Sequence, residues 1–326
     1  MNVKILVRVS TFTCAAVLIA AQILASAQQL DPTMPGALFG YVCVDADSQT
    51  GAGHDLYRID LTNGVAELRG ATGVGQELEG FLSADGFAAP NTSELFGVAE
   101  APDGTGPGGP SVLVNVTDAA LAIGNTGSVV GTTGIEFGTE AGAAYDFLGD
   151  QHAYSIAADD LTRVVAGQQY PATRLYEIDL STGVATPLNT TEGLYLDGLA
   201  YGANGELYAT DARLTDALYR FNFAADPNGD GVAEGQWEPV GTFNTGEDFN
   251  EDSGLANYRG LNGDETHLYM VTEGDGPRLG RLWTVDFATG QATFVGELRI
   301  GSTTGPEVPE DVEAFDIPYL PLRGQM

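Results

Sequence analysis

LYRIDLTNGVA at residues 56–66 decides the fold, because the chain repeats it as LYEIDLSTGVA at 175–185 and as LWTVDFATGQA at 282–292. In each copy, apolar and polar residues alternate at period two, as in a half-buried strand. A Thr-Gly or Asn-Gly pair then supplies the positive φ of a tight turn, and a return strand follows. The phrase therefore predicts a β-hairpin, and its repetition predicts a stacked or circular array of one small unit.

A second two-stranded element precedes each hairpin. The clearest example is LDGLAY at 196–201, a turn at Asn204-Gly205 and LYATD at 207–211, followed by a degenerate hairpin copy, LYRFN at 218–222. Four antiparallel strands in about 50–60 residues make the blade of a β-propeller. First strands of such units are expected near Gly80, Ala144, Gly198, Gly260 and Ala314. Fourth strands are expected near Val65, Ser128, Val184, Trp237 and Ala292.

The two ends of this array complement each other. ALFGYV at 37–42 resembles a second strand without a first, and DVEAFDI at 311–317 resembles a first strand without successors. We predict that the C-terminal strand pairs into the N-terminal blade and so closes the ring without an open edge. The predicted fold is an all-β, five-bladed β-propeller. Six blades are the alternative, if a long insertion contains a degenerate blade.

Residues 1–27 have the pattern of a secretory signal peptide. Lys4 and Arg8 precede an apolar run, which ends in the small-residue site Ala25-Ser26-Ala27. We therefore expect an exported protein, periplasmic or extracellular, with residues 28–326 forming a single propeller domain. No later run is long and apolar enough to predict a membrane-spanning helix. Cys43 is the only cysteine after the signal, so we expect a buried core thiol and no internal disulfide.

The formal net charge is -32, from 45 acidic and 13 basic residues. So acidic a surface repels nucleic acid and anionic lipid, which excludes both as partners. Lys4 is the only lysine and lies in the signal, which also excludes lysine-based chemistry in the mature chain. Adaptation to a salty or calcium-containing environment explains the charge without any specific anionic function. We expect a monomer that binds an unidentified protein or carbohydrate.

The motif DPNGDGVAE at 226–234 is the sharpest candidate for metal binding. Oxygen-bearing side chains stand at its positions one, three, five and nine, namely Asp226, Asn228, Asp230 and Glu234, with glycine at position six. Ca²⁺ prefers six to eight oxygen ligands on such a tightly curled loop. The motif resembles the calcium repeats of thrombospondin type-3 modules and the first half of an EF-hand loop, although Trp237 occupies position twelve. A calcium-stabilised loop is therefore expected, with a solvated Asn/Gly/Asp turn as the alternative.

A set of carboxylates at the central channel is the second candidate. Glu79, Asp197 and Glu313 occupy one repeat position at the start of first strands. Arg259 takes this position in the fifth unit, and the third unit offers either Glu140 or Ala143. Converging acids could bind a cation or separate each other's pKa values for catalysis. The alternative is that an acid followed by glycine is simply how these strands begin.

Residues 197–208 carry a family resemblance. Asp197-Gly198-Leu199-Ala200 followed by Gly205-Glu206-Leu207-Tyr208 resembles the repeats of the gluconolactonase/SMP-30 and NHL-like propellers. The Leu-Tyr-x-Ile-Asp-x-x-Thr-Gly phrase resembles that of uncharacterised exported bacterial propellers. The lactonase resemblance implies a divalent metal held by a glutamate, an asparagine and an aspartate, for which Glu79 and Asp197 could stand as the two acids. No matching asparagine is present, and the family has six blades.

The remaining polar and aromatic residues point to packing rather than to catalysis. His152 and His267 precede second strands, as Glu94 and Glu206 do, so the repeat accepts any polar residue there. The recurrent tyrosines could form a carbohydrate platform, but packing between blades is the preferred interpretation for Tyr57, Tyr176, Tyr208, Tyr219 and Tyr269. The sequence therefore favours a calcium-stabilised binding scaffold. A metal-dependent hydrolase or lactonase that uses Glu79, Asp197 and Glu313 is the alternative.

Overall fold

The fold is seen in a computed structural model of the chain. It describes residues 39–44, 54–100, 111–135, 141–147, 151–165, 168–188, 193–246, 249, 253–258, 267–273, 280–302, 304–306, 312–318, 320 and 322–325. The expected signal peptide lies outside these ranges. No helix of the described part is long and apolar enough to cross a membrane.

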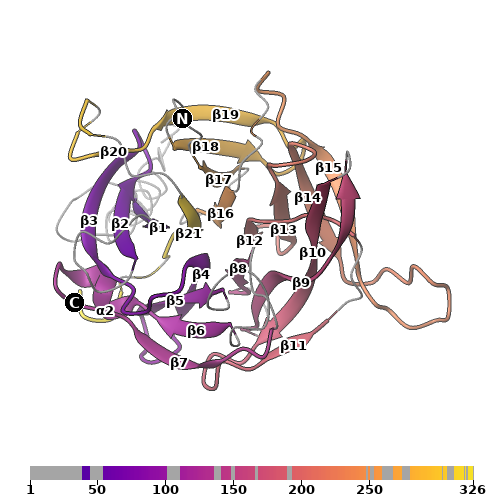
Figure 1. Ribbon diagram of the computed structural model, residues 1–326, viewed down its shortest axis with the longest axis horizontal. Coiled ribbons are helices and arrows are strands. Elements are labelled where there is room, and N and C mark those ends of the chain that lie inside the picture. The colour runs from indigo at the N-terminus through magenta and orange to yellow at the C-terminus, as the bar shows by residue number, and fades with distance from the viewer. Residues whose placement is uncertain are drawn as a thin grey trace, which may run out of the picture.

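Five sheets stand in a ring, each built on four antiparallel strands, which confirms the five-bladed β-propeller (Figure 1). Blade 1 consists, from the axis outward, of β21 (Val312–Asp316), β1 (Phe39–Val44), β2 (Asp55–Asp60) and β3 (Val65–Ala71), with β20 (Arg299–Ile300) added parallel to β3. Blade 2 consists of β4 (Leu78–Asp85), β5 (Ser93–Ala99), β6 (Val112–Asn115) and β7 (Ser128–Thr132), and the short helix α2 (Thr117–Leu121) joins its last two strands.

The other three blades have the same order from the axis to the rim. Blade 3 consists of β8 (Gly142–Tyr145), β9 (Ala153–Val165), β10 (Gln168–Ile178) and β11 (Ala185–Pro187). Blade 4 consists of β12 (Leu199–Tyr201), β13 (Leu207–Asp211), β14 (Ala217–Asn222) and β15 (Gln236–Thr242). Blade 5 consists of β16 (Ser253–Asn257), β17 (His267–Thr272), β18 (Arg281–Asp286) and β19 (Ala292–Glu297).

The C-terminal strand closes the ring as predicted. In β21, Phe315 pairs antiparallel with Val42 of β1, so the last strand of the chain is the first strand of blade 1. The chain then continues to blade 2, where the Arg323 Nε donates to the Glu94 Oε1 at 2.5 Å and the Arg323 N–H donates to the Ser93 carbonyl at 3.0 Å. Both ends of the ring are therefore joined by backbone pairing and by a charged contact.

One predicted strand position was wrong. The first strand of blade 5 is β16 at Ser253–Asn257, not a segment near Gly260, and Arg259 lies outside the described residues. Ser253-Gly254-Leu255-Ala256 copies Asp197-Gly198-Leu199-Ala200, with serine in place of the acid. A search for an acid or another charge before glycine therefore misses this strand.

Glycines let the inner strands approach each other backbone to backbone. A Cβ on Gly80 would lie 2.5 Å from the Ala141 carbonyl oxygen, and a Cβ on Gly142 would lie 2.6 Å from the Leu199 nitrogen. The inner strands contact each other around the ring, and β8 also contacts β16 and β21 across it. The centre of the ring is therefore narrow.

The repeated turns pack against the rim of the preceding blade. Gly64, Gly183 and Gly290 have φ values of 78°, 82° and 76°, as the turn requires. A Cβ on Gly290 of blade 5 would lie 2.5 Å from the carbonyl oxygen of Gly241, in the outer strand of blade 4. Gly183 meets Gly131 of blade 2 in the same way. At these junctions the turn of one blade meets the outer strand of the preceding blade backbone to backbone.

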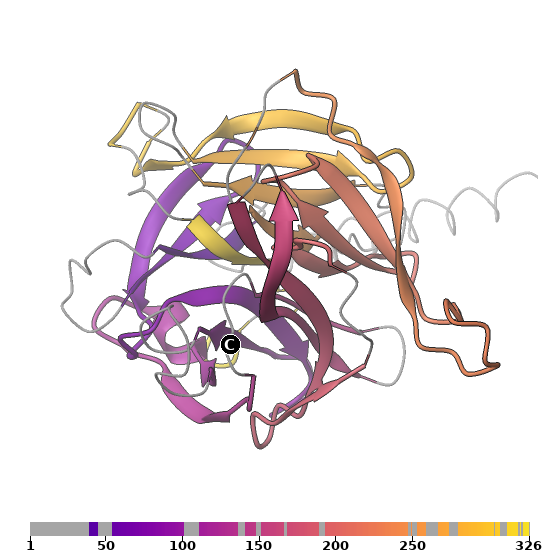
Figure 2. The same ribbon diagram turned by 45° about the vertical axis from the view of Figure 1, so that its right-hand side comes forward.

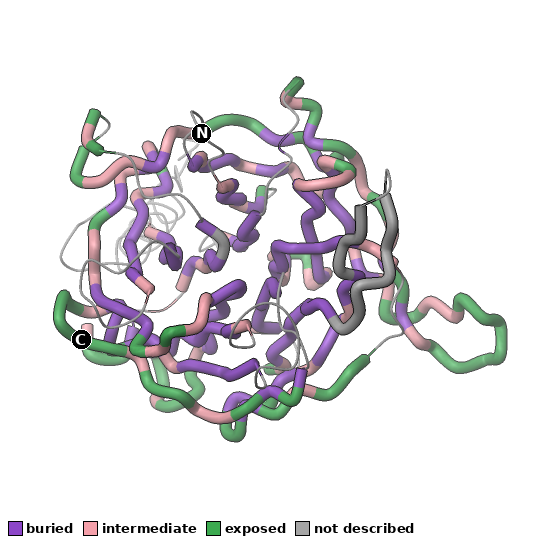
Figure 3. The backbone as a smooth tube through the Cα atoms, in the orientation of Figure 1, coloured by how far each residue is buried: buried purple, intermediate pink, exposed green. Residues whose placement is uncertain are grey.

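The hydrophobic core consists of five clusters, each shared by two neighbouring blades. Buried residues concentrate on the inner strands and exposed residues on the rim (Figure 3). Cys43 is buried, as expected. Four of the five recurrent tyrosines belong to these clusters and are less than 9% exposed, namely Tyr57, Tyr176, Tyr208 and Tyr219. Tyr269 is partly buried against one cluster, so all five pack between blades.

Candidate functional site

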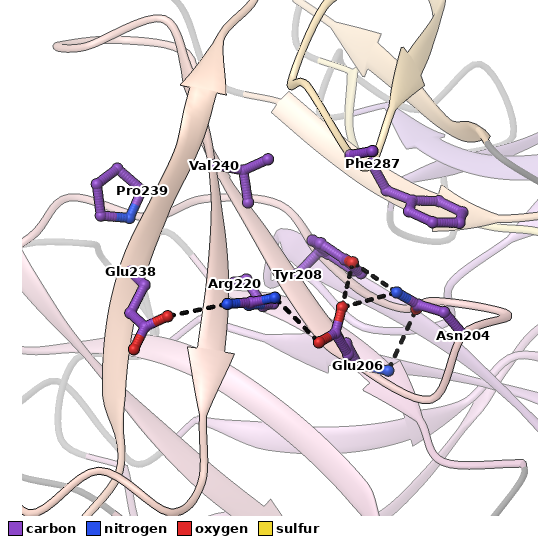
Figure 4. A pocket seen from close by; sticks show the side chains of 9 residues that line it. Asn204, Glu206, Tyr208, Arg220, Glu238, Pro239, Val240 and Phe287 are labelled. Carbon is purple, nitrogen blue, oxygen red and sulfur yellow. Dashed lines mark hydrogen bonds and ion pairs between the residues drawn. The ribbon is translucent and has the colours of Figure 1, made fainter.

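A cleft of about 380 Å³ lies between blades 4 and 5 (Figure 4). Residues from three strands of blade 4 and from the β18–β19 turn of blade 5 line it: Asn204, Glu206, Tyr208, Arg220, Glu238, Pro239, Val240, Phe287 and Ala288. Its volume lies within the usual range for small-molecule sites, about 300–1,000 Å³. We call it the 4–5 cleft.

Arg220 is the centre of the polar wall of the 4–5 cleft. Its Nη1 lies 3.1 Å from the Glu206 Oε1, and its Nη2 lies 3.0 Å from the Glu238 Oε2. The register of blade 4 produces this row, because Arg220 of β14 pairs with Tyr208 of β13 on one side and with Glu238 of β15 on the other. One guanidinium is therefore held between two carboxylates, in the geometry that charge-assisted hydrogen bonds favour.

Three neutral side chains complete the network. The Tyr208 hydroxyl donates to the Glu206 Oε2 at 2.7 Å, and the Asn204 Nδ2 donates to the same oxygen at 2.7 Å. Asn222 donates to the other oxygen of Glu238 at 2.8 Å. Figure 4 shows this row running across the sheet toward Phe287. Polar groups on one side and an aromatic ring on the other therefore face the same cleft.

The pKa values of this network follow from its contacts. Burial, and then the hydrogen bond to Glu206, raise the pKa of Tyr208 well above its usual value, so its hydroxyl remains a donor. The hydrogen bond to Glu238, and then the charge of Glu206, raise the pKa of Arg220. Hydrogen bonds from Asn222 and then from Arg220 lower the pKa of Glu238, which stabilises its charged form.

A second cleft, of about 290 Å³, lies between blades 3 and 4 at the equivalent place. Its lining includes the repeat-equivalents of residues in the 4–5 cleft: His152 for Glu206, Tyr154 for Tyr208, Glu177 for Arg220 and Phe223 for Phe287. Leu188, Phe221, Ala233, Glu234 and Gly235 complete the lining. We call it the 3–4 cleft, and the blade repeat therefore builds both clefts from one set of positions.

The channel carboxylates expected from the sequence occupy different surroundings. Glu79, on β4, is 7% exposed, and its carboxylate lies with those of Glu77 and Glu100 so that the ligand oxygens are all within 4.8 Å of one another. This is the only such group of three or more His, Cys, Asp or Glu side chains among the described residues. Glu77 and Glu100 were not among the sequence-based candidates, because they lie outside the repeat position that pointed to Glu79.

Asp197 does not belong to that group. Its Oδ1 accepts hydrogen bonds from the Gly198 N–H at 2.8 Å, from the Thr210 hydroxyl at 3.0 Å and from the Ser253 hydroxyl at 3.0 Å. Asp197 is 4% exposed, and these hydrogen bonds join β12 and β13 of blade 4 to β16 of blade 5. Glu313 lies on β21, and Ala141 and Ser253 take the equivalent position in blades 3 and 5. The repeat therefore places acids in only three of five blades.

The expected calcium loop connects β14 to β15 and projects from the ring (Figures 1 and 2). Asp226 accepts from the Gly229 N–H at 2.8 Å and from the Gly231 N–H at 2.7 Å, which curls the loop around its carboxylate. Asn228 donates to the Glu234 Oε1 at 2.9 Å. Asp230 accepts from the Val232 N–H at 2.8 Å. These carboxylates do not form a close group of three like that at Glu79.

Neither cleft was expected from the sequence. A signal was nevertheless present at the position directly after the Asp or Asn that ends the first strand of each repeated hairpin. This residue is leucine in two blades, Leu61 and Leu180, and phenylalanine in the other two, Phe223 and Phe287. Variation at one repeat position thus marked the two clefts. Sequence reasoning treated His152 and Glu206 as arbitrary polar residues, whereas both line a cleft.

No family model matches the chain, and no curated protein matches it. Similar solved structures include TolB from Acinetobacter baumannii (12% identity, TM-score 0.43), which covers 82% of this chain, while the chain spans only 55% of TolB. The PQQ-bound aldose sugar dehydrogenase from Streptomyces coelicolor has 16% identity and a TM-score of 0.40, with 77% and 79% of the two chains covered. A putative TolB from Agrobacterium tumefaciens has 14% identity and a TM-score of 0.39, with 85% and 98% covered.

Proposed function

We propose that this protein is a non-catalytic binding propeller whose 4–5 cleft holds a neutral, hydroxyl-rich ring ligand such as a saccharide. The Glu206–Arg220–Glu238 row opposite Phe287 is the observation that carries this proposal. Carboxylates accept hydrogen bonds from sugar hydroxyls, and the guanidinium and Asn204 donate to them. Phe287 offers an aromatic face to the apolar C–H side of the ring.

The charges of the row favour a neutral ligand over an ionic one. Arg220 already pairs with both carboxylates, so a charged ligand would have to displace an internal ion pair. A neutral hydroxyl can instead share the outer lone pairs and N–H groups of this network. Burying such groups is favourable only if they remain hydrogen-bonded, which a polyhydroxylated ring achieves.

The Phe287→Ala variant is expected to weaken saccharide binding by at least about tenfold, because it removes the apolar wall of the cleft. Isothermal titration calorimetry with cellobiose, maltose and lactose would measure this. Phe223→Ala is the matched control, since it makes the same change at the equivalent position of the neighbouring blade and leaves the 4–5 cleft intact. Absence of binding by all three sugars, or equal losses in both variants, would contradict the proposal.

The proposal includes export of the protein to the periplasm or the extracellular space, and stabilisation of its β14–β15 loop by calcium. The leader-like residues 1–27 and the acidic surface support this. Asp226, Asn228, Asp230 and Glu234 are the proposed ligands, and the backbone hydrogen bonds of Asp226 preorganise the loop for them. Water and carbonyl oxygens would complete the coordination of Ca²⁺.

We expect millimolar calcium to raise the melting temperature of residues 28–326 above its value in excess EDTA. A ligand at about 100 times its dissociation constant stabilises the native state by roughly 2.7 kcal/mol. The Asp230→Ala variant should lose this shift, which differential scanning calorimetry at fixed ionic strength would measure. An unchanged melting temperature in the unsubstituted protein would remove calcium from the proposal.

The same melt distinguishes the alternative function, a metal-dependent hydrolase or lactonase with Glu79 in the channel. The grouping of Glu79 with Glu77 and Glu100 favours a divalent cation there. A calcium shift that survives Asp230→Ala and disappears with Glu79→Ala would place the metal at this group. Loss of a lactone-hydrolysing activity in the same Glu79→Ala variant would then support the enzyme. Asp197 would in either case keep the hydrogen bonds that join blades 4 and 5.

A further inference from the structure

We propose that the 3–4 cleft binds an organic cation, a guanidinium or amidinium group, by means of Glu177, Glu234 and the ring of Phe223. This inference is independent of the saccharide proposal, because it concerns a different cleft. It starts from a comparison of blades 1, 3 and 4, in which the strand registers show which residues occupy equivalent positions.

The row crosses three strands in each of these blades. In blade 4 it reads Tyr208–Arg220–Glu238, and in blade 1 it reads Tyr41–Arg58–Glu67. In blade 3 the corresponding residues are Tyr154–Glu177–Thr186. Glutamate therefore replaces arginine at the central position of blade 3, which reverses the charge there.

Blades 1 and 4 each supply a guanidinium to this position. The Arg58 Nη2 lies 2.7 Å from the Glu67 Oε2, and its guanidinium carbon lies 4.1 Å from the centre of the Phe39 ring. Arg220 is held between two carboxylates, those of Glu206 and Glu238. The repeat thus builds a place for a planar cation from carboxylates and, in blade 1, an aromatic face.

Blade 3 does not keep the partners of these arginines, because His152 stands at the position of Phe39 and Glu206, and Thr186 at that of Glu67 and Glu238. The 3–4 cleft has an aromatic ring, Phe223, and two carboxylates of its own, Glu177 at the arginine position and Glu234 from the β14–β15 loop. No lysine or arginine is among its described lining residues. Phe223 is 44% exposed and packs against Tyr154 at 5.9 Å and against Phe221 at 4.8 Å between ring centres. The packing fixes its ring while leaving a face available to a ligand.

The neighbours of the two carboxylates leave them able to accept further hydrogen bonds. Glu177 contacts the Nδ1 of His152 through its Oε1, and Glu234 accepts from Asn228 through its own Oε1. Each carboxylate has a second oxygen, and a carboxylate offers about four lone-pair directions. A planar cation with several N–H donors matches two such carboxylates beside an aromatic ring.

The experiment compares benzamidine with benzamide, its neutral analogue of nearly the same shape. Titration calorimetry of residues 28–326 is performed in EDTA, so that calcium does not compete for Glu234, and at a fixed ionic strength of about 150 mM. We expect benzamidine to bind at least about tenfold more tightly than benzamide, since only the cation gains from the carboxylates and from the ring face.

Two variants locate the bound cation. Glu177→Gln keeps the size and hydrogen-bonding ability of the side chain and should weaken benzamidine binding by at least about fivefold. Glu238→Gln, which removes the same charge from the 4–5 cleft, should leave it unchanged. Phe223→Leu should also weaken binding, and the melting temperature of each variant shows that it is folded.

Three results would overturn the inference. Equal affinities for benzamidine and benzamide would show that charge does not determine binding. Equal losses in Glu177→Gln and Glu238→Gln would assign binding to the overall negative charge of the chain rather than to the 3–4 cleft. Absence of benzamidine binding to the unsubstituted protein would show that the cleft takes no such cation.

Discussion

A chain that ends at Asp311, immediately before β21, is expected to lose its cooperative unfolding transition. Phe315 of β21 is 2% exposed and Ala314 is fully buried, so this truncation opens the core of blade 1 and leaves β1 as an unpaired edge. Loss of one buried phenylalanine side chain alone costs about 3–5 kcal/mol, a large part of a typical total stability of about 5–15 kcal/mol. Calorimetry and near-ultraviolet circular dichroism would detect the loss.

A shorter truncation is the control for this result. A chain that ends at Pro318 keeps β21 and loses only the C-terminal segment, including Leu322, which is 1% exposed, and Arg323 with its contact to Glu94. It should melt cooperatively at a lower temperature than the full chain. If the chain ending at Asp311 melted as cooperatively as this control, the pairing of β21 with β1 would not be what holds the ring closed.

Gly142→Ala is expected to destabilise the protein by about 3 kcal/mol, at the upper end of the usual cost of overpacking. The new Cβ would meet backbone atoms of the neighbouring blade, with the Leu199 nitrogen at 2.6 Å and the Asp197 carbonyl oxygen at 2.7 Å. Backbone in the inner ring cannot move aside as a flexible side chain can. The melting temperature should fall by about 5 °C for a domain of about 300 residues, as calorimetry would show.

Gly75→Ala is the matched control, because a Cβ on Gly75 would meet no atom within 4 Å. It makes the same chemical change in a place without crowding, and it reduces the conformational freedom of the unfolded chain. We expect its melting temperature to equal or slightly exceed that of the unsubstituted protein. Similar decreases in both variants would show that crowding at Gly142 is not the cause, and no decrease in Gly142→Ala would show that the inner strands can move apart.

Most of the fold could be predicted because its signal is local and repeated. The period-two pattern and the Thr-Gly or Asn-Gly turn identify each outer hairpin. Because the first unit lacks its first strand, the unpaired strand at the end of the chain can be assigned to it. Blade 5 shows where this reasoning fails. Ser253 carries no charge, so a pattern based on an acid before glycine passes over β16 and selects Arg259-Gly260 instead.

The candidate sites were harder to predict because they depend on contacts between units. Glu77 and Glu100 come from β4 and β5 ends that only the sheet brings to Glu79. The clefts combine a row across three strands of one blade with an aromatic residue from the next. Phe287 alone indicates nothing about Arg220, since they are 67 positions apart in the sequence and only the packing of blade 5 against blade 4 makes them neighbours.

The turn at Gly290 against Gly241, and the turn at Gly183 against Gly131, have a consequence for how such a chain can change over time. Because these junctions consist of main chain, substitutions elsewhere in a blade leave them intact, and a duplicated blade carries its own connectors with it. Residues that line the clefts are therefore free to diverge from copy to copy. Introducing the Tyr208–Arg220–Glu238 row into another blade would accordingly change side chains only and leave the backbone contacts between blades as they are. New recognition sites can therefore arise in one blade without a change in the architecture of the ring.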